Sequence, residues 1–142
     1  VKPLFVDTNV LIYANVRETP LHERALGAIQ TAKKQGRQIW ISTQVIREYL
    51  VTLTRPQAFD ELPRATALEQ VAYFTGRFQV AEDTTSVMAQ LIALMGKFQI
   101  GGKQVHDANI VATMLAYGVP CLLTHNVKDF RRFGQLVQIE EI

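Results

Sequence analysis

The sequence predicts an α/β domain built on a mostly parallel sheet of four or five strands, and three observations favour this fold class. Short apolar runs alternate along the chain with longer amphipathic segments, which is the pattern of parallel strands joined by crossover helices. The 142 residues are 48% hydrophobic and 20% charged, as expected for one compact domain with a substantial core. No internal repeat or linker interrupts the pattern, so residues 1–142 are interpreted as a single domain.

Stop and cap signals place the elements of the first half. The apolar run 4–6 is the first strand, and the short polar side chains that follow it are suited to cap a helix that begins near Val10. Gly36 ends the next helix, and the residue before Pro56 is pushed out of helical geometry. The further elements expected here are a helix over 21–35, a strand over 38–41, a helix over 43–55 and a helix over 63–76.

The second half continues the alternation. Asp83 or Thr84 caps a helix with a regular apolar stripe, and the loop 101–103 lacks the upstream glycine and the hydroxyl residue of a phosphate-binding loop. Gly118 breaks the following helix. The expected elements are a strand over 78–80, helices from residue 84 and over 105–116, a strand over 121–123 and an edge strand over 136–139, giving about six helices in all.

Composition excludes several classes of protein. The single cysteine, Cys121, lies in an apolar run, so no internal disulfide can form and a reducing compartment is favoured. No apolar stretch reaches the roughly 18 residues of a membrane span, and no signal-peptide pattern opens the chain. The sequence therefore predicts a cytoplasmic protein without membrane association. A net charge of +2 is too small to predict a nucleic-acid partner by itself.

Polar residues follow two of the predicted strands. Asp7 ends the first strand, and Thr124, Asn126 and Asp129 follow the strand over 121–123. Ligands of an open parallel sheet bind beyond the carboxyl ends of its strands. Asp7 is either a helix cap or a functional carboxylate, and the second interpretation gains weight because Thr8 and Asn9 are also able to cap.

Two further acids are candidates for the same site. Asp107 lies in the apolar stripe of its helix, where a carboxylate must be paired, protonated or bound to a metal. The alternative is that Asp107 belongs to the first helical turn, where the helix dipole favours an anion. Glu48 lies at the margin of an apolar stripe, and its alternative is a solvated residue that pairs with Arg47 or Arg55.

A cluster of carboxylates requires cations, because like charges repel. Oxygen ligands without repeated cysteine or histidine spacing favour Mg²⁺ or Mn²⁺ over Zn²⁺. His106 and His125 adjoin the candidate acids, where they either contact substrate or transfer protons, or are ordinary surface residues.

The charge outside this cluster suits a polyanionic substrate. When Asp7, Glu48, Asp107 and Asp129 are set aside, 9 acids remain against 15 lysines and arginines, a charge of +6. An acidic, cation-binding site within a basic surface fits nucleic acid. The candidate phosphate contacts, which are otherwise ordinary solvated charges, are Lys128, Arg131 and Arg132.

Four segments follow the predicted strand ends and helix starts along nearly the whole chain: residues 5–12 (FVDTNVLI), 41–48 (ISTQVIRE), 106–112 (HDANIVA) and 123–130 (LTHNVKDF). These segments resemble those of PIN-domain endoribonucleases, in particular the VapC-type toxins of prokaryotic toxin–antitoxin modules, and they occur in the order of that family.

The resemblance implies a three-layer α/β/α PIN-like fold and a role for each site residue. Asp7, Glu48 and Asp107 would form the acidic metal site, with Asp129 as a fourth or supporting acid. Asp7 and Asp107 would ligate directly, whereas Glu48 would ligate through water or orient the attacking water. The supporting residues would be Thr8 and Asn9, which hold Asp7, and Thr124 and Asn126, which line the pocket. Many family members carry Asp in place of Asn126, so this site has one charge fewer.

The implied reaction is Mg²⁺- or Mn²⁺-dependent hydrolysis of RNA, which leaves a 5′-phosphate and a 3′-hydroxyl. The resemblance also implies a homodimer and an antitoxin whose C-terminal segment wraps the toxin's helices and blocks the acidic pocket. Apolar and aromatic residues on the early helices offer loose support for that partner, although most of them fit a core role: Tyr13, Tyr49, Phe59, Tyr73 and Phe74.

Three other functions compete with this hypothesis. A phosphatase of the haloacid-dehalogenase type also places Asp after its first strand, but it needs a second Asp where this chain has Asn9. A PIN-like module that binds RNA or protein without cleavage is favoured by Asn126 and disfavoured by the three retained acids. A housekeeping RNA-processing nuclease would share the site, and its gene would lack a neighbouring antitoxin gene.

Overall fold

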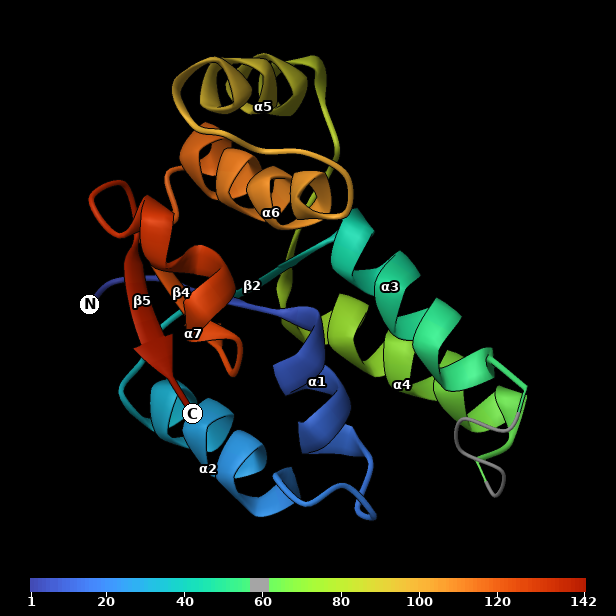
Figure 1. Cartoon of the computed structure of the whole chain (residues 1–142). Coiled ribbons are helices and arrows are strands. Elements are labelled where there is room, and N and C mark those ends of the chain that lie inside the picture. Colours follow the sequence, from blue (N-terminus) through green and yellow to red (C-terminus); the bar gives the residue numbers. More distant parts are fainter. Residues whose placement is uncertain (57–61) are drawn as a thin grey trace.

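The computed structural model describes residues 1–56 and 62–142 and contains a five-stranded sheet in which every pair of neighbouring strands is parallel (Figure 1). The strand order is β3-β2-β1-β4-β5. This confirms the predicted α/β fold class. The strands are β1 (Leu4–Val6), β2 (Ile39–Ser42), β3 (Gln79–Ala81), β4 (Cys121–Thr124) and β5 (Gln138–Glu141).

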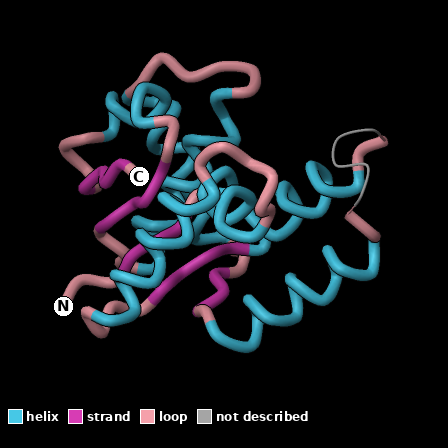
Figure 2. The backbone as a smooth tube through the Cα atoms, turned by 90° about the horizontal axis from the view of Figure 1, so that it is seen from below, coloured by secondary structure: helices cyan, strands magenta, loops and turns pink. Residues whose placement is uncertain are grey.

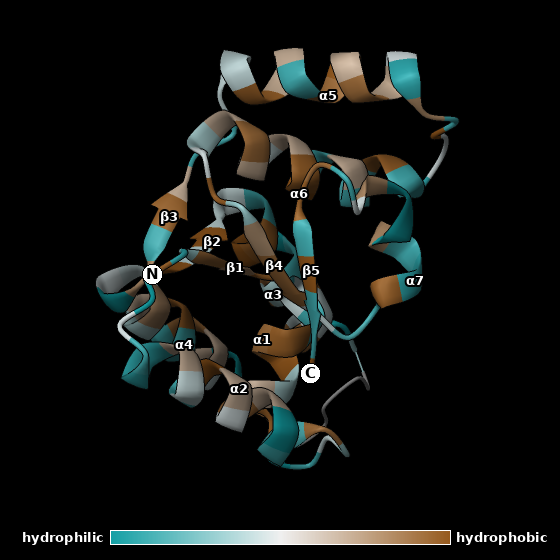
Figure 3. Cartoon of the chain, turned by 90° about the vertical axis from the view of Figure 1, so that its left-hand side faces the viewer, coloured by the Kyte–Doolittle hydropathy of each residue, from teal (hydrophilic) through white to brown (hydrophobic). Residues whose placement is uncertain are grey.

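Helices cover both faces of the sheet, which gives the three layers (Figure 3). One side carries α1 (Thr8–Asn15), α2 (His22–Lys34), α3 (Thr43–Thr54) and α4 (Arg64–Arg77). The other carries α5 (Thr85–Lys97), α6 (Gln104–Tyr117) and the short α7 (Val127–Phe130), with α6 between α5 and the sheet. The paired helices α3 and α4 extend beyond the sheet as an arm (Figure 2).

The core follows from the strand order. β1 lies at the centre of the sheet, and its three residues are all buried, as expected for a parallel strand covered on both faces. α6 is apolar around much of its surface because it lies between α5 and the sheet. Gly118 takes a left-handed conformation, with φ of 69°, and ends α6 as predicted. None of the described helices is long and apolar enough to cross a membrane.

Several boundaries differ from the sequence prediction. α1 begins at Thr8, two residues earlier than expected. The last strand is shifted to 138–141, because residues 136 and 137 form a turn whose backbone N–H groups bond to the Phe133 carbonyl. The described residues form seven α-helices and a 3₁₀ turn, η1 (Arg131–Phe133). α7 and η1 were missed because neither is long enough to show helical periodicity.

Candidate active site

A pocket of about 710 Å³ lies at the carboxyl edge of the sheet. Its wall comes from the end of β1, one face of α1, one face along the whole length of α3, the start of α6, and the loop after β4. We call it the acidic pocket. Its lining residues are Asp7, Thr8, Asn9, Ile12, Gln44, Arg47, Glu48, Val51, Thr52, Arg55, Lys103, His106, Asp107 and Asn126.

Asp7 both caps α1 and lines the acidic pocket. Its Oδ1 accepts a hydrogen bond from the backbone N–H of Thr8 at 2.8 Å, and its Oδ2 accepts one from Thr124 Oγ1 at 2.8 Å. The expectation that Thr8 or Asn9 can provide the cap is wrong, because both lie inside the helix. Burial raises the pKa of Asp7 to about 7, against the lowering effect of these hydrogen bonds.

Glu48 faces the acidic pocket from α3. Its Oε1 accepts a hydrogen bond from Thr8 Oγ1 at 2.7 Å, and its Oε2 accepts one from Gln44 Nε2 at 3.2 Å. The alternative in which Glu48 pairs with Arg47 or Arg55 is wrong, because Glu48 makes no ion pair within residues 1–56 and 62–142. Arg47 instead pairs with Asp83, with 3.9 Å between Arg47 Nη2 and Asp83 Oδ2.

Asp107 is half-buried and enters the pocket from the start of α6. Both interpretations of this residue hold, because it belongs to the first turn and its side chain also lines the acidic pocket. Burial raises its pKa to about 6, and the negative charges of Asp129 and Glu48 add to the effect. The positive charges of His106 and Arg132 oppose it.

The residues after β4 take different positions. Thr124 is fully buried, and its hydroxyl oxygen accepts a hydrogen bond from the backbone N–H of Asn126 at 3.0 Å. Asn126 lines the acidic pocket, whereas Asp129 is exposed on α7 and does not. Asp129 therefore affects the site only through its negative charge, which raises the pKa of Asp107.

The basic residues that line the acidic pocket were not among the phosphate contacts predicted from the sequence. They are Arg47, Arg55 and Lys103. Arg47 within α3 and Arg55 directly after it lie on either side of Glu48 in the sequence, which is a signal that could have identified them. The expected contacts Lys128, Arg131 and Arg132 are exposed outside the pocket lining, and Arg132 donates a hydrogen bond to the Gln99 carbonyl at 2.7 Å.

The two histidines are also separated. His106 lines the acidic pocket, whereas His125 lies outside its lining and contacts Tyr13 edge-to-face, with ring centroids 5.8 Å apart.

The donor chemistry of the pocket fits a hard divalent cation. Asp7 and Asp107 have raised pKa values, so a nearby cation would stabilise their charged forms. Asn9 Oδ1 is buried without a hydrogen-bond partner among the described residues. Within the described residues, no three His, Cys, Asp or Glu side chains are placed to coordinate one metal ion together. Mg²⁺ does not need such a group, since it is commonly held by one or two carboxylates and several waters.

A family model for the PIN domain matches residues 4–136. The chain belongs to the PIN domain family. This PIN domain is 26% identical over 134 residues to ribonuclease VapC24 of Mycobacterium tuberculosis, an alignment that covers 92% of the chain and 91% of VapC24. It is 25% identical over 130 residues to ribonuclease VapC48 of the same organism, with 89% of each protein covered.

Solved structures share the fold of this PIN domain. VapBC2 from Rickettsia felis, bound to a promoter DNA fragment, matches with a TM-score of 0.75 at 18% identity over 98% of both chains. VapC20 of Mycobacterium tuberculosis, described as a sarcin-ricin loop cleaving toxin, matches with a TM-score of 0.69 at 15% identity, covering 91% of this chain and 94% of its own. These likenesses confirm the PIN-like architecture.

Proposed function

We propose that this PIN domain is a metal-dependent endoribonuclease and the toxin of a toxin–antitoxin pair. One observation carries the proposal: Asp7, Glu48 and Asp107 line one pocket together with three basic side chains. Carboxylates suit a divalent cation at the scissile phosphate, and basic side chains suit the neighbouring phosphates. The relatives named ribonuclease VapC24 and VapC48 support RNA as the substrate.

The metal would be held by Asp7 and Asp107, with Asn9 Oδ1 as a further oxygen in reach of the same pocket. When bound, Mg²⁺ or Mn²⁺ lowers the pKa of the attacking water and neutralises charge at the phosphate. Thr124 and Thr8 orient the Asp7 carboxylate by hydrogen bonds to its two oxygens. Asp129 supports the site by its charge beside Asp107.

Glu48 would orient the attacking water. Each of its carboxylate oxygens accepts one hydrogen bond from the described residues, so each keeps a lone pair for a water in the acidic pocket. Water oxygen would bond to phosphorus as the bond from phosphorus to the 3′ oxygen breaks, which leaves a 5′-phosphate and a 3′-hydroxyl. Arg47, Arg55 and Lys103 would hold the flanking phosphates.

Cleavage of a panel of structured and single-stranded RNAs tests the proposal. The purified protein is assayed with Mg²⁺, with Mn²⁺ and with EDTA, beside Asp7→Asn prepared in the same way. We expect metal-dependent cleavage that a folded Asp7→Asn variant lacks. Binding of RNA without cleavage under every metal condition would favour the non-cleaving PIN-like module instead.

An antitoxin is the proposed protein partner. Solved neighbours include a toxin–antitoxin complex from Klebsiella pneumoniae, at 23% identity with a TM-score of 0.66 over 99% of this chain and 100% of its own. A second cavity, of about 400 Å³ between α1, α2 and α4, offers an apolar surface for a partner segment. Tyr73 is half-exposed and Phe74 is buried, and both line this cavity. Tyr49 is buried in the core outside the cavity lining, and Phe59 lies outside the described residues.

The identity of the neighbouring gene distinguishes a toxin from a housekeeping RNA-processing nuclease. A neighbouring gene for a small DNA-binding protein, whose product co-purifies with this chain and blocks RNA cleavage, is the expected result. Its absence would favour RNA processing as the function.

A homodimer is the proposed assembly, and α5 offers a face for it. Val87, Leu91 and Leu94 are buried. The helix leaves three large apolar side chains in solvent at helical spacing: Met88, Ile92 and Met95.

A further inference from the structure

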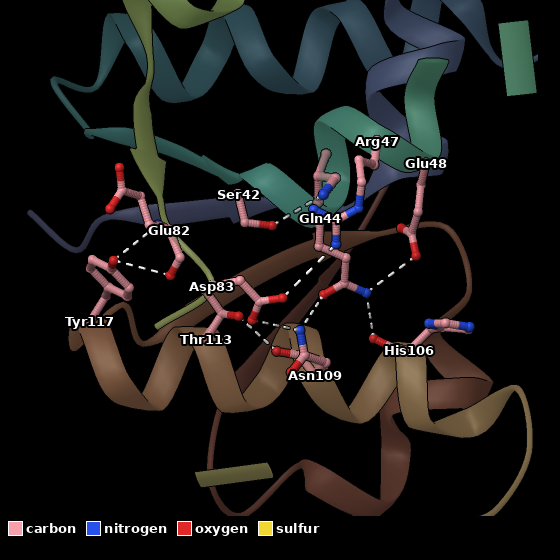
Figure 4. A network of polar contacts seen from close by, with 11 residues as sticks. Ser42, Gln44, Arg47, Glu48, Glu82, Asp83, His106, Asn109, Thr113 and Tyr117 are labelled. Atoms are coloured by element: carbon pink, nitrogen blue, oxygen red, sulfur yellow. Dashed lines mark hydrogen bonds and ion pairs between the residues drawn. The ribbon is translucent and has the colours of Figure 1, made fainter. Parts of the chain in front are cut away.

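Gln44 is a buried amide at the junction of α3 and α6 (Figure 4). Only 5% of its surface is exposed, and it lies one helical turn before Glu48. Its Nε2 donates hydrogen bonds to Glu48 Oε2 at 3.2 Å and to the His106 carbonyl at 2.8 Å. Its Oε1 accepts a hydrogen bond from Asn109 Nδ2 at 2.8 Å. Both polar atoms of the amide are therefore used.

We propose that Gln44 is a positioning residue that fixes the Glu48 carboxylate in the acidic pocket relative to the first turn of α6. The inference rests on the proposed function, because it assumes that Glu48 takes part in RNA cleavage. Gln44 itself would touch neither the scissile phosphate nor the metal.

The surroundings of Gln44 select one orientation of its amide. A flipped amide would turn Oε1 toward the Glu48 carboxylate and the His106 carbonyl, both of which only accept hydrogen bonds. It would also turn Nε2 toward the Asn109 amino group, which only donates. Asn109 is oriented in turn because its amino group also faces Asp83 Oδ1 at 3.4 Å. The direction of the hydrogen bond to Glu48 is thus fixed from outside the pocket.

Glu48 depends on two contacts for its position. Thr8 holds one carboxylate oxygen from α1, and Gln44 holds the other from within α3. Both hydrogen bonds that connect α3 to α6 in the described chain involve Gln44. Loss of this amide would therefore free one oxygen of Glu48 and also remove the polar connection between the two helices that carry Glu48 and Asp107.

Gln44→Met tests the role, because methionine is similar in length and has no amide. We expect kcat for RNA cleavage to fall about 10- to 100-fold, the range typical of residues that orient side chains of a metal site by hydrogen bonds, with KM for RNA nearly unchanged. Thr113→Val is the matched control. It removes another buried hydrogen bond of α6, from Thr113 Oγ1 to the Asn109 carbonyl at 2.8 Å, without touching Glu48. This control should keep the wild-type kcat.

A double-mutant cycle separates positioning from a general loss of structure. If Gln44 acts through Glu48, Gln44→Met should change kcat less than about 2-fold in a Glu48→Ala background. A drop there as large as in the wild-type background would overturn the proposal.

The crystal structure of Gln44→Met gives a readout that does not require cleavage. We expect the Glu48 carboxylate to leave its hydrogen bond with Thr8 or to occupy several orientations. An unchanged Glu48 position would overturn the inference even in an active enzyme. Failure of the wild-type protein to cleave any RNA would instead contradict the proposed function, and the crystal structure would still decide whether Gln44 positions Glu48.

Discussion

Thr124 Oγ1 donates a hydrogen bond of 2.8 Å to Asp7 Oδ2, which joins the ends of two neighbouring strands inside the protein. The register of β1 and β4 pairs Val6 with Leu123, so the next residue of each chain segment meets at the carboxyl edge. Thr124 is held in turn by the backbone N–H of Asn126. The Asp7 carboxylate is therefore oriented by the sheet itself before any metal or substrate binds.

Asp7→Asn should make the protein more stable at pH 8 and inactive toward RNA. The ordinary pKa of an Asp carboxyl is 3.8, and the pKa of Asp7 in the folded chain is about 7. Well below the first value, Asp7 is protonated in both the folded and the unfolded chain. Between the two values, Asp7 is ionised in the unfolded chain but still protonated in the folded chain. Stability therefore falls as the pH rises through this range and stays low above it. We expect the free energy of unfolding of Asp7→Asn to exceed that of the wild type by about 1–3 kcal/mol at pH 8.

Denaturant unfolding at pH 4 and pH 8 measures this effect. The difference between the two proteins should nearly vanish at pH 4, and an equal difference at both pH values would contradict the assigned cause. Asp7→Ala is the control for the cap, because it also loses the hydrogen bond to the Thr8 N–H and should be about 1 kcal/mol less stable than Asp7→Asn.

Divalent cations should stabilise the protein more strongly at higher pH. Protons compete with the metal for Asp7 and Asp107, whose pKa values are raised to about 7 and about 6. The increase in Tm on adding Mg²⁺ or Mn²⁺ should be small at pH 5.5 and larger at pH 8. The double variant Asp7→Asn, Asp107→Asn should show no such increase, and a shift of wild-type size in that variant would place the cation elsewhere.

Arg55→Ala and Lys103→Ala should weaken RNA binding through the loss of phosphate contacts. Each residue lines the acidic pocket, so each substitution should raise KM and reduce the slope of log affinity against log salt by about one. Lys128→Ala removes an exposed charge outside the pocket lining and serves as the control. Equal effects of all three substitutions would point to a diffuse field rather than to contacts at this pocket.

Ile92→Glu should convert the proposed dimer into a monomer. The side chain is 64% exposed at the middle of the apolar stripe on α5, and a buried, unpaired carboxylate there would be costly. Light scattering after size-exclusion chromatography measures the mass. Leu68→Glu, at a site on α4 that is 54% exposed, is the control and should leave the mass unchanged. A dimer that survives Ile92→Glu would assign the interface to another face.

Much of the fold was predictable from local pattern. In the described parts of the chain, hydrophobic periodicity and stop signals located every strand and the six longer helices to within a few residues, because these signals lie within the segments themselves. The short α7 carries no such signal and was missed. The acids at the carboxyl ends of strands were also identifiable, since parallel strands bring those ends to one edge.

The sequence by itself determined the alternation of strands and helices and the candidate acids Asp7, Glu48 and Asp107. Only the tertiary structure decided which side chains surround them. The contact between Thr124 and Asp7 joins residues 117 positions apart, and the contacts of Gln44 with α6 join residues 62 and 65 positions apart. Such pairs depend on strand order, on register and on how each helix is rotated about its axis. The hydrophobic periodicity of one segment contains none of that information. The raised pKa values and the basic lining of the pocket could therefore be read only from the assembled sheet.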